Sequence, residues 1–148
     1  MALLSRKGLL AIAAVIDVAL YHRGRPVSAK ALAMRHQLPA RHLEPVLQAL
    51  VRDGILKGIR GPRGGYELAR ERKKITADDI LRAAGTIEDD GDLAKSGSTL
   101  LNEVVRPAVA QAEKAFSAAL GRINVEEIGE KSRTIPQQFR RRSMTLLA

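Results

Sequence analysis

Apolar positions recur with the period of an α-helix over three stretches in the first half of the chain. The first runs from Ser5, a plausible N-cap, to Tyr21, and Gly24 and Pro26 close it. Ser28 can cap a second, shorter helix. This second helix and the amphipathic third stretch, separated by about four residues, predict a helix-turn-helix. The third stretch has one apolar face at i, i+3, i+4 and i+7, made of Leu43, Val46, Leu47 and Leu50.

The opposite face of the third helix is polar. It carries Arg41, Glu44 and Gln48, with Ala40 at the start of the helix. Arg, Glu and Gln can read base edges in the major groove of DNA, although a solvated helix face shows the same pattern. Pro45 has no backbone N–H and disfavours a mid-helix position. We therefore expect the regular helix to begin late, near residues 40–42, so that the proline lies close to the first turn.

A β-hairpin with a cationic tip is predicted directly after this helix. Residues 55–60 alternate between two faces, with Ile55 on one and Leu56 on the other, and the next strand turns Tyr66 inward. A helix-turn-helix followed by such a hairpin is a winged helix, whose arginines can reach the DNA backbone or minor groove. The candidate DNA contacts of the wing are Arg60, Gly61, Arg63, Gly64 and Tyr66, and Ser28 is the candidate at the N-terminus of the second helix.

A long helix in the last third carries two apolar strips. One strip contains Leu100 and Phe116, and the other steps by three or four residues, as in a coiled-coil seam. Such a helix can cover its own domain with one strip and a partner subunit with the other, although packing into a monomeric core is the alternative. Pro107 should kink this helix or mark a junction. The predicted dimer contacts are Leu101, Val105, Ala108, Ala112, Ala115, Ala119 and Ile123.

Shorter signals complete the organisation of the chain. Thr76 and Asp79 have the spacing of a capping box for one more helix, and Asn124 with Glu127 can cap a last one. The expected organisation is a winged helix-turn-helix domain over 1–85, an acidic mobile loop over 86–97, a dimerisation helix with a short capping helix over 98–131, and a basic flexible tail over 132–148.

Charge is unevenly distributed along the chain. The formal net charge is +9; residues 1–86 carry +9, residues 87–132 carry −4, and residues 133–148 carry +4. Localised basic charge with a pI near 10.5 is typical of nucleic-acid binding. With only 3% aromatic residues, single-stranded or RNA recognition by stacking is disfavoured, which leaves double-stranded DNA as the expected partner.

Several kinds of chemistry are not supported. The chain has no cysteine, which excludes disulfides, thiol catalysis and cysteine-held iron–sulfur clusters. The glycines at 58–65 lack the Lys-Ser/Thr ending of a phosphate loop, and His22, His36 and His42 lack metal-ligand spacing. The chain is therefore expected not to be an enzyme, to use no cofactor or metal, and to be cytoplasmic.

The segment LEPVLQALVRDGILKGIRGPRGGYELARE, followed by ITADDILRA, resembles the Rrf-two (IscR-type) family of bacterial winged-helix transcription regulators. The resemblance runs from Ser5 to about Ile128. It implies a homodimer crossed over through the long helix and bound to a pseudo-palindromic operator. By position, Arg41, Glu44 and Gln48 would read bases and Arg60 would enter the minor groove. Many members hold an iron–sulfur cluster with three cysteines in the loop before the long helix, whereas this chain has no cysteine.

The sequence thus predicts a mainly α winged helix-turn-helix protein with a two-stranded β wing and a long C-terminal dimerisation helix. The expected function is sequence-specific binding of operator DNA as a homodimer, with repression as the expected direction of control and no iron–sulfur cluster. The alternative is a regulator that acts mainly through a protein partner or a small-molecule effector, which then modulates its affinity for DNA.

Overall fold

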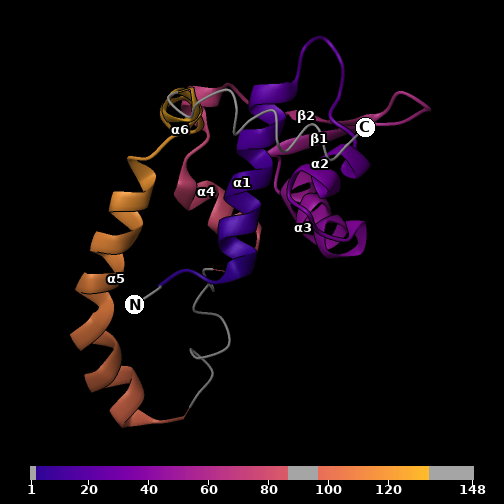
Figure 1. Ribbon diagram of the computed structural model, residues 1–148. Helices are drawn as coiled ribbons and strands as arrows, with labels where there is room; N and C mark the ends of the chain where they lie inside the picture. Colours follow the sequence, from indigo (N-terminus) through magenta and orange to yellow (C-terminus); the bar gives the residue numbers. More distant parts are fainter. Residues whose placement is uncertain (1–2, 87–96, 134–148) are drawn as a thin grey trace.

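The computed structural model describes residues 3–86 and 97–133 (Figure 1). The predicted acidic loop and basic tail lie largely outside these residues. No helix in the described ranges is both long and apolar enough to cross a membrane. The elements in chain order are α1 (Arg6–Tyr21), α2 (Ala29–Arg35), α3 (Ala40–Arg52), β1 (Leu56–Ile59), β2 (Gly65–Leu68), the short 3-10 helix η1 (Arg72–Lys74), α4 (Ala77–Ala83), the π-helical turn η3 (Leu101–Val105), α5 (Arg106–Gly121) and α6 (Val125–Ser132).

Side-chain caps start the helices where the sequence predicts them. The Ser5 and Ser28 hydroxyls each accept a hydrogen bond from a first-turn amide, both at 3.1 Å. Thr76 and Asp79 form a complete capping box, with both bonds at 3.1 Å. Asn124 Oδ1 accepts from an amide of α6 at 2.9 Å. These caps satisfy amide groups that would otherwise have no partner, so they confirm the predicted helix starts.

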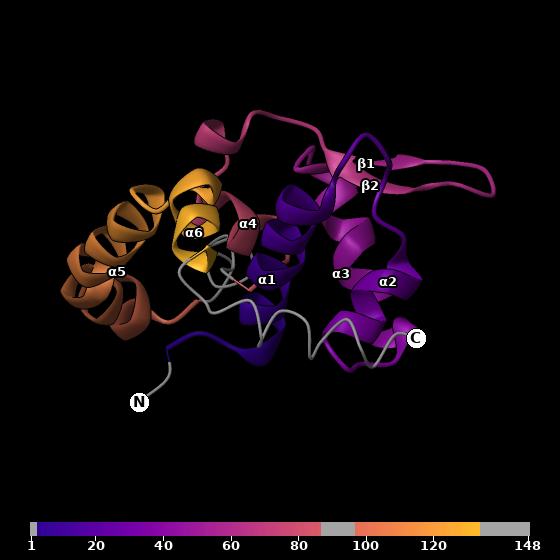
Figure 2. The same ribbon diagram turned by 45° about the horizontal axis from the view of Figure 1, so that its top comes forward.

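One hydrophobic core surrounds α1, which lies in the centre of the molecule with α3 and the strands on one side and α4 and α6 on the other (Figures 1 and 2). The core packs α1 against α3 and the β1–β2 hairpin. The predicted apolar face of α3 is buried as a whole, which confirms it. The core side chains with an exposed fraction of 0% in α1 and α3 are Ala11, Ala14, Val15, Val18, Leu43, Leu47 and Leu50.

The hairpin is buried at its base and exposed toward its tip. Strands β1 and β2 are antiparallel, with Leu56 opposite Leu68 and Ile59 opposite Gly65. Both Ile55 and Leu56 are 1% exposed, so both side chains are buried where the hairpin starts. Ile55 precedes the strand, where the chain leaving α3 still lies inside the core. Ile59 is 38% exposed because the hairpin extends beyond the core toward its tip.

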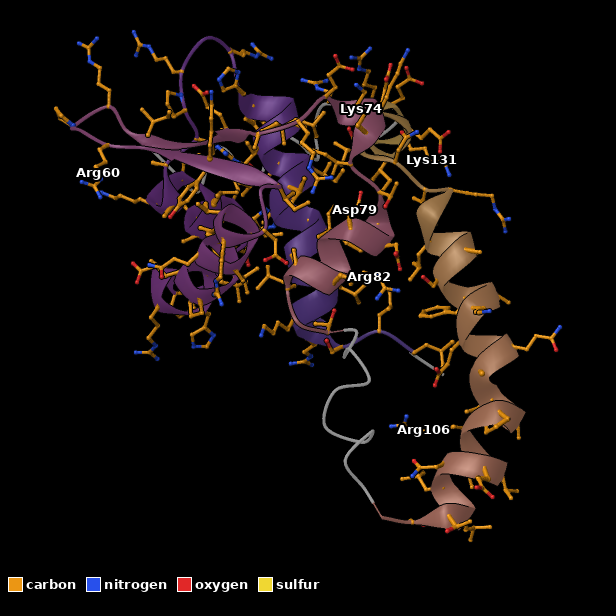
Figure 3. All side chains as sticks on the ribbon, turned by 180° about the vertical axis from the view of Figure 1, so that it is seen from behind. Arg60, Lys74, Asp79, Arg82, Arg106 and Lys131 are labelled. Atoms are coloured by element: carbon orange, nitrogen blue, oxygen red, sulfur yellow. The ribbon has the colours of Figure 1, made fainter. Side chains whose placement is uncertain are left out.

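A joint between α4 and α5 connects the core to the C-terminal helix. Leu81 packs with Leu120, and Phe116 lies against the same small cluster. Beside it, Ser117 Oγ donates to Asp78 Oδ1 at 2.9 Å and accepts from Arg82 Nη2 at 3.0 Å. Figure 3 shows Arg82 on the side of α4 that faces α5. The C-terminal half of α5 is therefore fixed to the body of the protein.

The remainder of α5 extends away from the core (Figure 1). The helix begins after the π-helical turn η3, with Pro107 near its start. A proline removes one intrahelical hydrogen bond, and the wider turn accommodates this loss, which confirms the predicted junction. The expectation that the strip continues in the helix to Ile123 was wrong, because α5 ends at Gly121. Ile123 lies in the link to α6, where its carbonyl accepts from Ala77 N at 2.8 Å.

Candidate nucleic-acid interface

The polar face of α3 is fully available to a ligand. Arg41, Glu44 and Gln48 are all exposed and lie at spacings of three and four residues, so they share one face of the helix. Ala40 is the first helical residue and is half-buried against the core. The helix therefore starts within the predicted window of residues 40–42. Pro45 falls in the second turn and is exposed on this same side of α3.

The glycines of the wing are required by the geometry of its turn. Gly64 N donates to Gly61 O at 2.9 Å, with Pro62 and Arg63 between them, as in a β-turn. A Cβ on Gly64 would lie 2.2 Å from the carbonyl oxygen of Ile59. Gly61 has φ +115°, a conformation that favours glycine. These glycines thus act by closing the turn that presents the neighbouring arginines.

The arginines of the wing tip point away from the core. Arg60 and Arg63 are exposed, and within the described ranges neither forms an ion pair. Figure 3 places Arg60 at the end of the molecule opposite α5. Tyr66 differs from them, because it is half-buried and packs against the core. The wing therefore presents two unpaired guanidinium groups, while its tyrosine anchors the hairpin.

The connection between α1 and α2 extends the wing by one residue. Val27 N donates to Tyr66 O at 2.9 Å, and Tyr66 N donates to Val27 O at 2.8 Å. Gly65 lies so close to this connection that a Cβ would be 2.4 Å from Val27 O. Ser28 follows at once, and its hydroxyl oxygen is occupied in capping α2. The helix-turn-helix and the wing are thus joined by an isolated β-bridge that was not predicted from the sequence.

A buried ion pair fixes α2 to α1. Asp17 is 5% exposed, and its two carboxylate oxygens accept from Arg35 Nε at 2.9 Å and Nη2 at 2.6 Å. His36 Nε2 lies 3.0 Å from Oδ2 of the same carboxylate. The Arg35 guanidinium also lies 4.1 Å from the centre of the Tyr21 ring. This role of Asp17 was not predicted from the sequence. A carboxylate inside a buried helical face needs a cationic partner, and that requirement was the available signal.

A second charged group supports the base of the wing. Glu67 on β2 lies between His22 Nε2 and Lys57 Nζ, each 3.3 Å from one of its carboxylate oxygens. The contact with the His22 ring is the main reason why the pKa of Glu67 is below its usual value; desolvation opposes this effect and Lys57 adds to it. These contacts connect the end of α1 to both strands of the wing.

The residues present do not fit a cysteine-held iron–sulfur cluster. The chain has no cysteine, and its described residues contain no group of three or more His, Asp or Glu side chains placed to hold a metal ion. Cysteine thiolates are the usual ligands of such clusters. No role is therefore assigned to bound iron in this chain.

Residues 4–131 match the model of the Rrf2 family, described as "Iron-dependent Transcriptional regulator". The HTH-type transcriptional regulator CymR of Bacillus subtilis is 38% identical over 79 residues, which are 53% of this chain and 57% of that protein. The chain thus matches little more than half the length of the curated relatives. The family and these relatives are transcriptional regulators, so the comparison confirms a regulator and not an enzyme.

Two solved structures are similar over most of the chain. The structure of CymR (YrzC), the global cysteine regulator of B. subtilis, has a TM-score of 0.68 and 27% identity, and covers 88% of this chain and 98% of that one. T. potens IscR has a TM-score of 0.69 and 28% identity, with 88% of each chain covered. The predicted fold class, mainly α with a two-stranded wing and a long C-terminal helix, is confirmed by these likenesses.

Proposed function

We propose, from the premise that this chain belongs to the Rrf2 family of transcriptional regulators, that it binds double-stranded operator DNA sequence-specifically as a homodimer. The observation that carries the proposal is the exposed polar face of α3 beside a wing whose two exposed arginines form no ion pair with any described residue. A helix of this kind can read base edges in the major groove, while flanking cations bind phosphates and set its position. Repression is the proposed direction of control, and the bacterial cytoplasm is the proposed place of action.

Arg41 is the best residue for testing base recognition. Operator fragments are first selected from the host genome with the purified protein. Arg41→Ala should then cost about 1–3 kcal/mol on the selected operator if the guanidinium makes a bidentate base contact, and it should relax preference at one base pair. Arg63→Ala is the matched control, because loss of a phosphate contact weakens binding to all sequences alike. Equal loss on operator and random DNA for Arg41→Ala would contradict base reading by this helix face.

Arg60 is proposed to enter the minor groove beside the wing. A narrow, A·T-rich minor groove has enhanced negative potential, which favours an inserted arginine. Arg60→Ala should therefore weaken binding most on operators with A·T-rich flanks, as measured by competition between otherwise identical duplexes. A loss that is the same for G·C-rich flanks would reduce Arg60 to a phosphate contact.

The homodimer is proposed to form through α5. Of the predicted contacts, Leu101 is half-buried within the chain and the others are exposed, including Val105 at 43% and Ile123 at 41%. A strip of exposed apolar and alanine side chains can be covered by the same strip of a second copy, which also places two reading helices on one operator. This dimer gives the proposed binding both its symmetry and much of its affinity.

Ala112→Glu tests the dimer. A carboxylate in the middle of the strip would be buried without a partner, which costs several kcal/mol, so the variant should sediment as a monomer and lose operator affinity. Its circular dichroism should stay close to that of the wild type, because the core around α1 lies elsewhere. Glu113→Ala is the control for a change next to this position. A dimeric Ala112→Glu variant with normal operator affinity would place the interface on another surface.

A further inference from the structure

The turn between α1 and α2 carries two exposed cations beside the wing. Arg23 and Arg25 flank Gly24, which has φ +73° and so allows the tight reversal between them. The turn ends at Val27, which pairs with the edge of β2 that β1 leaves open. Figure 2 shows this connection beside the strands and next to α2. The turn that carries the two arginines thus lies beside the wing, on the β2 side.

The two arginines of this turn are not neutralised within the part of the chain that the structure describes. In the described part of the chain, neither Arg23 nor Arg25 forms an ion pair. The nearest acidic group in the sheet, Glu67, is already engaged by His22 and Lys57. Their charge is therefore available to an external anion. Arg70 and Arg72, which follow β2, instead donate to backbone carbonyls, and Arg70 also pairs with Asp79.

We propose that Arg23 and Arg25 bind DNA phosphates that lie outside the base pairs contacted by α3 and the wing tip, on the β2 side of the wing. The proposal rests on the DNA-binding function proposed above and adds a second set of contacts to it. The backbone pairing of Val27 with Tyr66 fixes the turn to the hairpin, so the arginines and the wing tip approach the duplex as one unit. Contacts to phosphate set position and affinity and carry no direct sequence information.

The test is the double variant Arg23→Gln/Arg25→Gln, compared with the wild type on the selected operator across a range of salt concentrations. Each lost phosphate contact should reduce the slope of log affinity against log salt by about one, so the double variant should lose about two per protomer, or about four for the dimer. The ratio of operator to random DNA affinity should remain unchanged. The matched control is Arg122→Gln/Arg133→Gln, which removes the same charge from exposed positions at the ends of α5 and α6.

Duplex length separates direct contact from general attraction. On a duplex trimmed to the base pairs protected by α3 and the wing tip, the wild type and the Arg23→Gln/Arg25→Gln variant should bind with the same slope. The proposal is overturned if the salt slope of the Arg23→Gln/Arg25→Gln variant on the long duplex equals that of the wild type. It is also overturned if the control variant lowers the slope by the same amount. In both cases, operator binding by the wild type is unaffected. Failure of the wild type to prefer any duplex instead overturns the DNA-binding function itself.

Discussion

Helices α3 and α5 are of similar length, 13 and 16 residues, yet they use their apolar residues differently. Four side chains of α3 are buried inside the chain, whereas Leu120 is the one buried residue of α5. Both helices were recognised from the same periodicity. The comparison teaches that a helical period predicts an apolar face without saying which molecule covers it. The face of α3 builds the protein's own core, and most of the face of α5 is left for another contact.

The largest expected effect on stability comes from breaking the ion pair that fixes α2, the helix packed against α3, to α1. Asp17→Ala would leave the Arg35 guanidinium, whose side chain is 10% exposed, without its carboxylate. Removing one partner of a buried ion pair typically costs about 3–5 kcal/mol, so thermal and denaturant unfolding should show a loss of this size. Asp53→Ala, at an exposed carboxylate after α3, is the control and should change stability little. A similar small loss for Asp17→Ala would mean that α2 is held mainly by apolar packing.

Two side-chain truncations, one in α3 and one in α5, test whether the apolar residues of each helix are covered within the same chain. Leu47→Ala in α3 removes a side chain that is 0% exposed and should lower the free energy of unfolding by about 2–5 kcal/mol. Val109→Ala in α5 removes one that is 45% exposed and should change it by less than about 0.5 kcal/mol in dilute protein. Urea unfolding at two protein concentrations measures both. Equal losses at high dilution would show that α5 belongs to the core of the single chain.

The smallest expected effect concerns pH and the wing. The folded pKa of Glu67 is lowered from its ordinary value of 4.5, mainly by His22. Its stabilising contribution is therefore present above that ordinary value and is lost as the pH falls through the lower folded pKa. Unfolding measured from neutral to acidic pH should show a shallower acid loss in Glu67→Gln than in the wild type. Glu71→Gln, which removes an exposed carboxylate of the next segment, serves as the charge control.

Local rules predicted much of this structure. The caps at Ser5, Ser28, Thr76 and Asn124 are contacts within three residues, so the sequence alone determines them. The start of α3 followed in the same way from Pro45, and the turn of the wing followed from its glycines. The polar face of α3 was also placed correctly, because its spacing follows from the helix itself.

Contacts between residues that lie far apart in the sequence could not be predicted from local patterns. The partner of Asp17 lies 18 residues away on another helix, and its choice depends on how α1 crosses α2. The β-bridge formed by Val27 has no alternating pattern of its own, because it consists of a single pair of backbone bonds. The burial of Leu56 depends on where the hairpin leaves the core. The end of α5 before Ile123 likewise depends on the backbone bond between Ile123 and α4.

The exposed strip of α5 has a consequence for the amount of protein in the cell. If a second copy covers it, monomer and dimer are in equilibrium, and the fraction of dimer rises with total concentration. Below the dissociation constant the concentration of dimer follows the square of the monomer concentration, so a twofold change in synthesis alters operator occupancy about fourfold. Folding of the core does not share this dependence, because α3 finds all its contacts within one chain. Cellular abundance would then set the response of the operator without changing the stability of the domain that reads it.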